Sequence, residues 1–388
     1  MSKTNYKRLG DYIREVDVRN RDLKVTKLLG VSVSKEFIPS IANTIGTDMS
    51  SYKIVKSRQF VYIEDTSRRG DKIAIALLQS IKEAIVSSIY RVFEVKNKNE
   101  LLPEYLMMWF RRPEFDRYAR FKSHGSAREI FSWEEMCDVE LPIPPIEQQR
   151  KIVAEYENIS KRIRLNEQMI TRLEETTQNL YRKMFIDGID KNNLPEGWRM
   201  GTLGEICEIN TDNISSKEKI KEIYYLDSSS VINNIFSKYQ ILNSSKDEIP
   251  SRAKRKVKYN DIVYSTVRPN LKHYGIIKDN VENLIVSTAF AVIRSCHKFI
   301  SNELLYLILI DDKNTEYLQG IAEMSKATYP SITPKDIKTL KILIPQKSTD
   351  LDYVNKLLKH CFNFIYFKHT ENDKLTELQS LLLVKIGQ

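Results

Sequence analysis

The sequence predicts an α+β protein made of two copies of one unit, each a globular α/β domain followed by a long helix. The two helices are predicted to pair as an antiparallel coiled coil. Two observations lead to this prediction. Four segments recur in the same order at a nearly constant spacing, and each copy ends in a long stretch whose apolar residues return every three or four positions.

The internal repeat defines the two units. The repeated segments lie 202, 200, 201 and 194 residues apart, and two copies are too few for a solenoid, in which three or more stacked units share a core. Each unit is therefore expected to fold largely by itself. The matching segments are "VKSRQFVYI" at 55–63 with "VKYNDIVYS" at 257–265, "AIVSSIYRVFEV" at 84–95 with "LIVSTAFAVIRS" at 284–295, Ile143-Pro144 with Ile344-Pro345, and "RLGDYIREV" near Leu9 with "TLGEICEI" near Leu203.

Each unit is expected to combine strands with helices. The runs at 84–95 and 284–295 are rich in β-branched and aromatic residues, as strands are. The stretch from Leu102 to Phe121 has helical spacing, and Pro113 is predicted to break it because proline lacks the N–H that a helix needs. These signals predict domains at 1–145 and 198–346, helices at 146–187 and 347–388, and a turn-rich linker at 188–197.

The two long helices carry apolar seams. The first seam is sustained over about four heptads, which is the pattern of a coiled coil. Asn166 and Thr177 interrupt the first seam, and Lys368 and Asn372 interrupt the second. Packing of each helix on its own domain is the alternative to pairing. The apolar seam residues are Ile152, Tyr156, Ile159, Ile163, Ile170, Leu173, Leu180 and Met184 in the first helix, and Leu351, Val354, Leu358, Cys361, Ile365, Leu375 and Leu382 in the second.

Charge and cysteine content restrict the class of protein. The 61 Lys and Arg residues exceed the 51 Asp and Glu residues, and the resulting net charge of +10 favours a polyanionic partner such as nucleic acid. The 4 cysteines form no C-x-x-C pair, which suits a reducing compartment. No stretch resembles a signal peptide or is apolar enough to span a membrane, so a soluble cytoplasmic protein is expected.

Sequence motifs of enzymes and metal sites are absent. There is no G-x-x-x-x-G-K-[ST] or G-x-G-x-x-G loop and no N/D-P-P-Y/F motif of amino-methyltransferases. The 5 histidines form no ligand pattern. We therefore expect no catalytic residue, no metal and no cofactor in this chain.

Two pairs of corresponding loops are suited to DNA. "TSRRGDK" at 66–72 corresponds to "TVRPNLKHY" at 266–274, and "SHGSAR" at 123–128 corresponds to "MSKATY" at 324–329. Arginine can hold O6 and N7 of guanine with two hydrogen bonds, whereas the basic run "SRAKRKVK" at 251–258 suits phosphates. A solvated charged loop is the alternative for any single residue. The candidate DNA-binding residues are Arg68, Arg69, Lys72, Ser126, Arg128, Arg252, Lys254, Arg255, Arg268, Lys272, Tyr274, Lys326 and Tyr329.

The segments around the first helix resemble a known family. A Gly-Ser loop, a strand ending in "LPIPPIEQQRKIV", a long helix ending near "LYRKMF" and the following "LPEGWRMGTLGEI" resemble the specificity subunit of type I restriction-modification systems. Pro144–Val153 and Leu194–Glu205 carry the most specific motifs, and the order domain, helix, domain, helix covers essentially the whole chain. The second half departs from this pattern, because Ile344–Val354 lacks the P-x-x-E-Q-Q part.

The resemblance implies a division of labour. Each domain becomes a target-recognition domain that reads one half of a bipartite double-stranded DNA target, and the paired helices set a half-site spacing that we expect to be about 10 bp. Two methyltransferase (modification) subunits dock on the helices and supply S-adenosylmethionine and adenine methylation, while restriction (translocase-endonuclease) subunits use ATP. The implied helix-pairing and docking residues are Pro145, Gln148, Gln149, Ile152, Tyr156, Ile159, Ile163, Ile170, Leu173, Leu180, Leu358, Ile365 and Leu375.

Two other functions fit the same sequence. A specificity subunit of a related system, whose single partner chain combines methyltransferase and nuclease, would have the same fold. A coiled-coil interaction scaffold that is merely basic would show no sequence-selective DNA binding, even with its partners present. The neighbouring genes distinguish the first alternative, and a DNA-binding measurement distinguishes the second.

Overall fold

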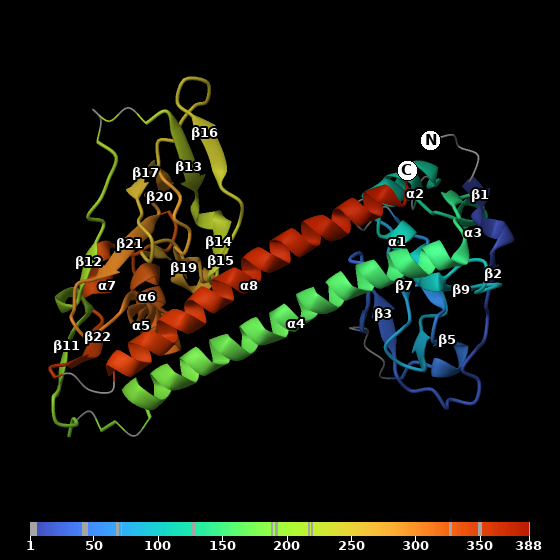
Figure 1. Ribbon diagram of the computed structural model, residues 1–388. Coiled ribbons are helices and arrows are strands. Elements are labelled where there is room, and N and C mark those ends of the chain that lie inside the picture. Colours follow the sequence, from blue (N-terminus) through green and yellow to red (C-terminus); the bar gives the residue numbers. More distant parts are fainter. Residues whose placement is uncertain are drawn as a thin grey trace. The chain divides into compact units, whose positions relative to one another are not determined.

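The computed structural model describes residues 6–40, 46–66, 70, 72–125, 129–187, 189–190, 193–215, 218, 220–325, 328–347 and 351–387. The chain forms two compact units. Unit 1 comprises Met1–Leu165 and Glu371–Gln388, and unit 2 comprises Asn166–Thr370, so each unit contains one globular domain and part of each long helix (Figure 1). Among the described helices, none has the length and apolar character that crossing a membrane requires.

The domain of unit 1 is built around a small antiparallel sheet. Its four strands lie in the order β2, β9, β6, β7, and two-stranded pairs surround them. Three short helices complete the domain. The elements are β1 (Tyr6–Arg8), β2 (Ile13–Glu15), β3 (Leu29–Val31), β4 (Phe37–Pro39), β5 (Lys53–Lys56), β6 (Phe60–Tyr62), β7 (Ile75–Leu77), β8 (Glu83–Val86), β9 (Arg91–Val95), α1 (Pro103–Phe110), α2 (Pro113–Lys122), α3 (Trp133–Cys137) and β10 (Glu140–Pro142).

The domain of unit 2 contains two four-stranded sheets. One has the order β12, β21, β18, β19, and the other has the order β16, β13, β20, β17. The elements are β11 (Trp198–Thr202), β12 (Cys207–Ile209), β13 (Glu222–Leu226), β14 (Val231–Ile232), β15 (Ile235–Phe236), β16 (Gln240–Asn243), β17 (Ala253–Lys256), β18 (Ile262–Ser265), β19 (Tyr274–Ile276), β20 (Leu284–Ser287), β21 (Phe290–Ser295), α5 (Asn302–Ile310), α6 (Asp312–Glu323), α7 (Pro334–Lys338) and β22 (Lys341–Pro345).

The structure confirms the internal repeat strand by strand. The sheet β2-β9-β6-β7 has the same order and antiparallel pairing as the sheet β12-β21-β18-β19. Even the register agrees, because Phe60 faces Phe93 in unit 1 and Ile262 faces Ile293 in unit 2. The aromatic pair is stacked with ring centroids 4.8 Å apart at the centre of the unit 1 core. The predicted break at Pro113 is also confirmed, since α2 begins there.

The two long helices, α4 (Ile146–Phe185) and α8 (Leu351–Lys385), pair within each unit. In unit 1, Arg162 forms an ion pair with Glu371 at 2.8 Å, and the side chain of Gln379 donates to Ser160 at 2.6 Å. As residue numbers rise along α4 they fall along α8, so the pairing is antiparallel. In unit 2, the same order brings the C-terminal part of α4 and the N-terminal part of α8 into one core, with Tyr181, Phe185, Leu351, Val354, Leu358 and Phe362 buried together.

Burial follows the predicted seams. The positions Ile170, Leu358 and Ile365 are at most 6% exposed, and the polar seam residues Asn166 and Thr177 are 1% and 2% exposed. Ile159, Ile163, Leu173, Leu180 and Leu375 are half-buried. Packing on the domains also holds, because Tyr156 of α4 and Ile386, the residue just after α8, lie in the core of unit 1, with Ile152 packed against it. Leu351 and Leu358 of α8 lie in the core of unit 2. Pairing and domain packing are therefore parts of one interface.

Gln149 was predicted to contact a partner subunit, but it is buried against its own domain. It is 0% exposed, so it is not available to a partner subunit. Its side-chain carbonyl accepts a hydrogen bond from the N–H of Leu102, just before α1, at 2.9 Å, and its amide donates to the carbonyls of Glu100 and Pro144, both at 2.8 Å. Gln149 thus fastens the start of α4 to its own domain. Pro145 and Gln148, by contrast, are exposed.

Asn355 provides the same anchor in unit 2, where the P-x-x-E-Q-Q pattern is missing. Its side-chain oxygen accepts from the N–H of Ser301, just before α5, at 3.3 Å, and its amide donates to the carbonyl of Phe299 at 3.0 Å. The two anchored groups are the repeat equivalents of those held by Gln149. The second helix therefore docks on its domain as the first does, through a residue at a different spacing.

Removing either anchor should destabilise only its own unit. Gln149→Ala leaves an N–H and two carbonyls near α1 without partners, and each such buried group costs about 1–3 kcal/mol. Hydrogen exchange should accelerate in unit 1 by the equivalent of about 2–4 kcal/mol, and Asn355→Ala should act similarly but less strongly on unit 2. The exposed Gln148→Ala is the matched control and should change stability by less than about 0.5 kcal/mol. Equal exchange in Gln148→Ala and Gln149→Ala would contradict the anchor.

The cysteines offer a chemical test of the helix pairing. Cys361 lies in the α8 seam at 7% exposure, and burial raises the pKa of its thiol. Burial also raises the pKa of Cys207 to about 12, which leaves only about one thiolate in ten thousand at pH 8. Iodoacetamide at pH 8 should therefore modify the exposed Cys296 first and spare Cys207 and Cys361 until the protein is denatured. Native labelling of Cys361 as fast as Cys296, read by peptide mass spectrometry, would mean that the seam is uncovered.

Candidate nucleic-acid interface

In unit 1, the structure brings the two predicted DNA loops together at their flanks. The hydroxyl of Thr66, before the first loop, donates to Ser123 at 2.9 Å, and the N–H of Thr66 donates to the carbonyl of Glu129 at 3.1 Å. Phe131 N–H donates to the carbonyl of Glu64 at 2.9 Å. Both loops therefore leave the domain from one place. Lys72 is exposed, while Arg68, Arg69, Ser126 and Arg128 lie outside the described residues and remain predictions.

Unit 2 builds the same arrangement at the equivalent place. Val267 and Ser331 form an isolated antiparallel β-bridge. On either side of it, the N–H of Arg268 donates to the carbonyl of Pro330 at 2.9 Å and the N–H of Ile332 donates to the carbonyl of Thr266 at 2.8 Å. The exposed Arg268 guanidinium lies over the exposed ring of Tyr329, 5.1 Å from its centroid. Lys272 is exposed, and Lys326 lies outside the described residues. The loop pair is thus assembled from corresponding segments in both units.

Tyr274 requires a correction, because it is a core residue. Its side chain is 3% exposed and its ring stacks on Tyr264 with centroids 5.6 Å apart. Burial raises its pKa to about 12. It is the first residue of β19, so the loop ends one residue earlier than the sequence suggested. A side chain buried in this way cannot contact DNA.

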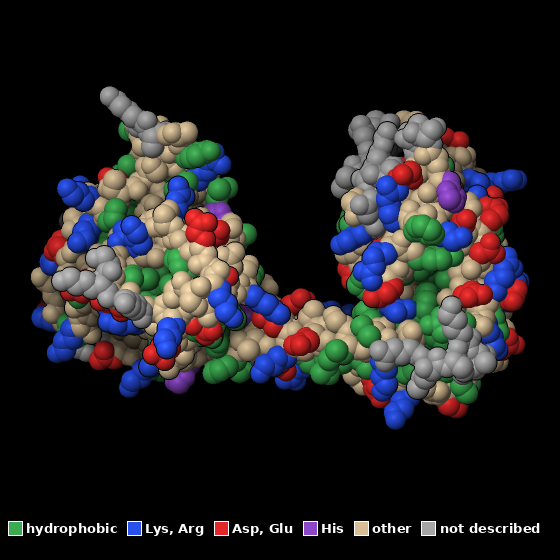
Figure 2. Space-filling model, turned by 90° about the horizontal axis from the view of Figure 1, so that it is seen from above, with side chains coloured by type: hydrophobic (Ala, Val, Ile, Leu, Met, Phe, Trp, Pro, Cys, Tyr) green, Lys and Arg blue, Asp and Glu red, His purple; other side chains and the backbone are tan. Residues whose placement is uncertain are grey.

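In the basic run at 251–258, some residues are exposed and others form hydrogen bonds or ion pairs within the domain. Arg252 and Lys254 are exposed beside and on β17. Arg255 is half-buried, and its guanidinium donates to the side-chain oxygen of Asn213 at 2.8 Å. Its side chain therefore makes a contact within the domain. Lys258 forms an ion pair with Asp212 at 2.9 Å. Figure 2 shows Lys and Arg side chains distributed over the surfaces of both domains, often beside Asp and Glu.

Sequence reasoning missed the residues that brace the loops. In unit 1, Lys35 is 6% exposed and forms an ion pair at 2.7 Å with Asp116, whose carboxylate also accepts from the N–H of Ile73 at 3.2 Å. Burial lowers the pKa of Lys35, while the pairing with Asp116 opposes that shift. The contact joins the β3–β4 turn to α2 and to the strand that follows the first loop. A lone lysine in a turn gave no signal of this role.

In unit 2, a two-residue turn braces the equivalent strand. Asn233 and Asn234 both have positive φ, 46° and 65°, as a tight hairpin turn requires. The N–H of Asn233 donates to the carbonyl of Lys272, and the N–H of Asn234 donates to the carbonyl of Tyr274, both at 2.8 Å. The side-chain oxygen of Asn234 accepts from the N–H of Ile276 at 2.8 Å. The adjacent asparagines were the available signal for this turn.

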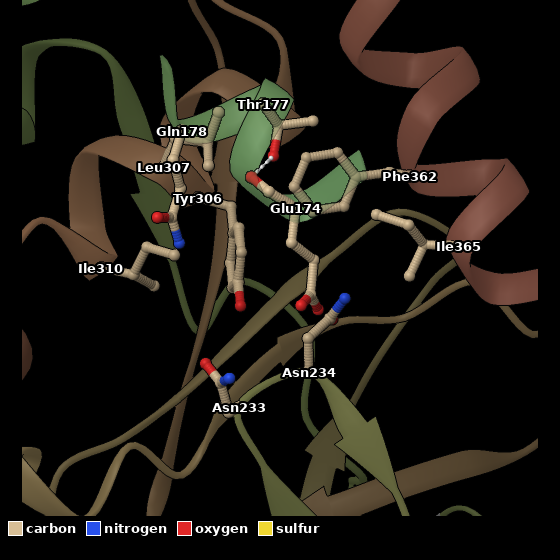
Figure 3. Close-up of a pocket in the computed structure, with 10 residues that line it drawn as sticks. All are labelled: Glu174, Thr177, Gln178, Asn233, Asn234, Tyr306, Leu307, Ile310, Phe362 and Ile365. Carbon is tan, nitrogen blue, oxygen red and sulfur yellow. Dashed lines mark hydrogen bonds between the residues drawn. The ribbon is translucent and has the colours of Figure 1, made fainter. Parts of the chain in front are cut away.

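A small cavity lies next to this turn. It has a volume of about 40 Å³ and is lined by α4, α5, α8 and the asparagine turn of unit 2 (Figure 3). Glu174 and the buried Tyr306 point into it, and burial raises the pKa of Glu174. A space of this size holds water molecules, since substrate pockets of drug-sized ligands measure roughly 300–1,000 Å³. The candidate interface is therefore the pair of corresponding loops in each unit, of which Lys72, Arg268, Lys272 and Tyr329 are described and exposed.

Comparison with known proteins identifies the family. The model of the type I restriction modification DNA specificity domain matches residues 32–175 and again residues 195–377. The chain is 32% identical over 166 residues to the type I restriction enzyme HindI specificity subunit of Haemophilus influenzae, a match that covers 41% of this chain and 35% of that protein. It is 21% identical over 405 aligned positions to the putative type I restriction enzyme MjaX specificity subunit of Methanocaldococcus jannaschii, covering 98% of this chain and 87% of that protein.

A solved structure shares the fold. The S subunit of a type I restriction-modification system from M. genitalium aligns with a TM-score of 0.65 at 12% identity, over 99% of this chain and 96% of that one. At this identity the likeness concerns the fold alone. The two family matches, however, cover most of the sequence, one in each half. The chain therefore belongs to the specificity subunits of type I restriction-modification systems, which are non-catalytic DNA-recognition subunits.

Proposed function

We propose that this chain reads a bipartite double-stranded DNA target, one half with each unit, and directs adenine methylation and restriction by partner subunits. The observation that carries the proposal is the loop pair that is assembled twice from corresponding segments, at Thr66 and Ser123 in unit 1 and at Val267 and Ser331 in unit 2. A target with two halves needs two reading sites of one architecture. S-adenosylmethionine and ATP would be bound by the partner subunits.

The exposed basic residues support a role in holding the DNA backbone. Lys72, Arg252, Lys254 and Lys272 are exposed near the loops or on β17, and the net charge of the chain is +10. The ammonium and guanidinium groups of such residues neutralise phosphates and release counterions, which makes binding steeply dependent on salt. Contacts of this kind position the protein on DNA, whereas base contacts from the loops would supply the sequence preference.

One flank of α8, within unit 2, supports the docking of methyltransferase subunits. Large apolar side chains on this flank are exposed instead of buried in the seam, and such exposed stripes mark interaction surfaces. Phe364 and Phe367 are 44% and 64% exposed on α8, and each directly precedes a buried seam residue. The docking flank consists of Tyr353, Phe364 and Phe367, which fall on one face of α8 within unit 2.

In the related system, in which one partner chain combines methyltransferase and nuclease, this chain would have the same role. It uses the same reading loops and the same helices, and only the partner differs. Which arrangement applies follows from whether methyltransferase and nuclease activities copurify as one polypeptide. The coiled-coil scaffold is a different class, because it predicts no sequence preference at all.

The first test is the pattern of adenine methylation in a host that expresses this chain with its neighbouring methyltransferase subunit. We expect a split motif with one fixed gap, present only when the chain is present. The control expresses the methyltransferase subunit alone. Sequencing that detects methylated adenine genome-wide gives both half-sites and the gap in one measurement.

An assembled complex that methylates no defined motif would contradict the proposal and favour the scaffold. Assembly is checked separately by size-exclusion chromatography with light scattering, so that a missing partner is not mistaken for missing specificity. A continuous motif without a gap would contradict the assignment of one half-site to each unit.

Truncation of the docking flank should weaken binding of the methyltransferase subunit. Phe367→Ser removes a large exposed aromatic group and should raise the dissociation constant at least about tenfold, as loss of an aromatic interface residue does. The matched control is Lys359→Ser, an exposed position on the same helix that lies about 80° around the helix axis from Phe367. Titration calorimetry with the purified methyltransferase subunit provides the measurement. Equal affinity of both variants would move the docking surface elsewhere.

A further inference from the structure

The strongest unassigned feature of the interface is the paired Arg268 and Tyr329 in unit 2. The guanidinium lies over the ring, with its Cζ atom 5.1 Å from the ring centroid, and both side chains are exposed. Among the described residues, the guanidinium has no hydrogen bond or ion pair, so its donor edge is available. Among the residues that the structure describes, no aromatic ring supports Lys272, the other exposed cation of this loop, in the same way.

The backbone around Arg268 is held in an unusual conformation. Arg268 and Lys272 have φ angles of 48° and 57°, on either side of the short turn Pro269–Leu271. Residues with side chains rarely adopt this left-handed region, and it persists only where the surrounding structure enforces it. Such strain in an exposed loop is a common property of ligand-binding segments.

Several contacts enforce this conformation. The N–H of Arg268 donates to Pro330 at 2.9 Å, and that of Asn270 donates to the side chain of Gln319 on α6 at 3.2 Å. Pro269 is buried beneath the turn. These contacts fix the backbone from which the Arg268 side chain projects toward Tyr329, so less conformational freedom is lost when DNA binds.

The chemistry of the pair favours a base over a phosphate. A guanidinium is planar and presents its N–H groups as a rigid fork, which matches the two in-plane acceptors O6 and N7 at the major-groove edge of guanine. A phosphate contact needs only charge and reach, which the unsupported Lys272 provides as a flexible point charge. The two cations of the loop are therefore suited to different parts of the DNA.

We propose that Arg268, held in position by the ring of Tyr329, reads a guanine in the half-site bound by unit 2. This inference rests on the proposed function and assigns one base type to one residue. Lys272 contacts a phosphate of the DNA backbone beside that base. Tyr329 is a positioning residue, because it acts through the guanidinium.

The test uses the complete complex of chain and methyltransferase subunits on DNA in which each base of the motif is varied in turn. Arg268→Lys retains the charge but loses the planar fork. At one guanine position of one half-site, its preference for guanine should fall by about 5- to 150-fold, the range for a bidentate contact. The other half-site and the gap should stay unchanged.

The supporting variants separate position from charge. Tyr329→Phe keeps the ring and should keep the preference, whereas Tyr329→Ala should relax the same guanine position to a smaller extent. Lys272→Ala should slow methylation at all sites alike and reduce its salt dependence. Size-exclusion chromatography of each complex confirms assembly, and Tyr329→Ala provides a second reading if an Arg268 variant fails to fold.

Two outcomes would overturn the inference. If Arg268→Lys reads the wild-type motif with unchanged preference at each position, Arg268 reads no base. If it slows methylation uniformly without changing the motif, Arg268 is a phosphate contact. Failure of the proposed function is distinguishable, because the wild-type complex would then show no motif from which a preference could be lost.

Discussion

Burial of the apolar seams of α4 and α8 is the interaction on which both units depend. The core of unit 1 contains Leu9 from the first residues of the domain and Ile386, the residue just after α8, and the hydroxyl of Tyr6 donates to the carbonyl of Gly387 at 2.9 Å. This core is complete only after segments some 380 residues apart have met. Because contacts over such sequence distances form slowly, the end of α8 is expected to join unit 1 late in folding.

At the start of each long helix the two units form equivalent hydrogen bonds, although their sequence motifs differ. The N–H and carbonyl groups ahead of α1 and α5 must find partners because they lie next to buried helices. Gln149 meets this need in unit 1 and Asn355 in unit 2. The longer and the shorter side chain reach equivalent groups from different positions, so the absence of the P-x-x-E-Q-Q pattern in the second half does not remove the anchor.

The features visible in the sequence are those set by local periodicity. The strand pair of Phe60 and Phe93 and its counterpart in unit 2 follow from apolar runs that the repeat displays twice, and the seams follow from a heptad pattern. Contacts that depend on tertiary geometry were not visible. Tyr274 reads as the end of a basic loop but is buried, and the brace between Lys35 and Asp116 joins residues 81 positions apart. At Arg268 the residue type was visible but the left-handed backbone was not.

Polar residues in the seams bear on the proposed use of the helices as a spacer. An entirely apolar seam allows one helix to slip along the other by a heptad, which amounts to about 10 Å or about three base-pair steps. Asn166 at 1% and Lys368 at 9% exposure lie in such seams, where buried polar groups cost stability but favour the one register that satisfies them. Asn166 and Lys368 both make polar or electrostatic interactions, so the cost is offset. A reader of two half-sites at a fixed gap requires one register, and these residues provide a physical reason for it.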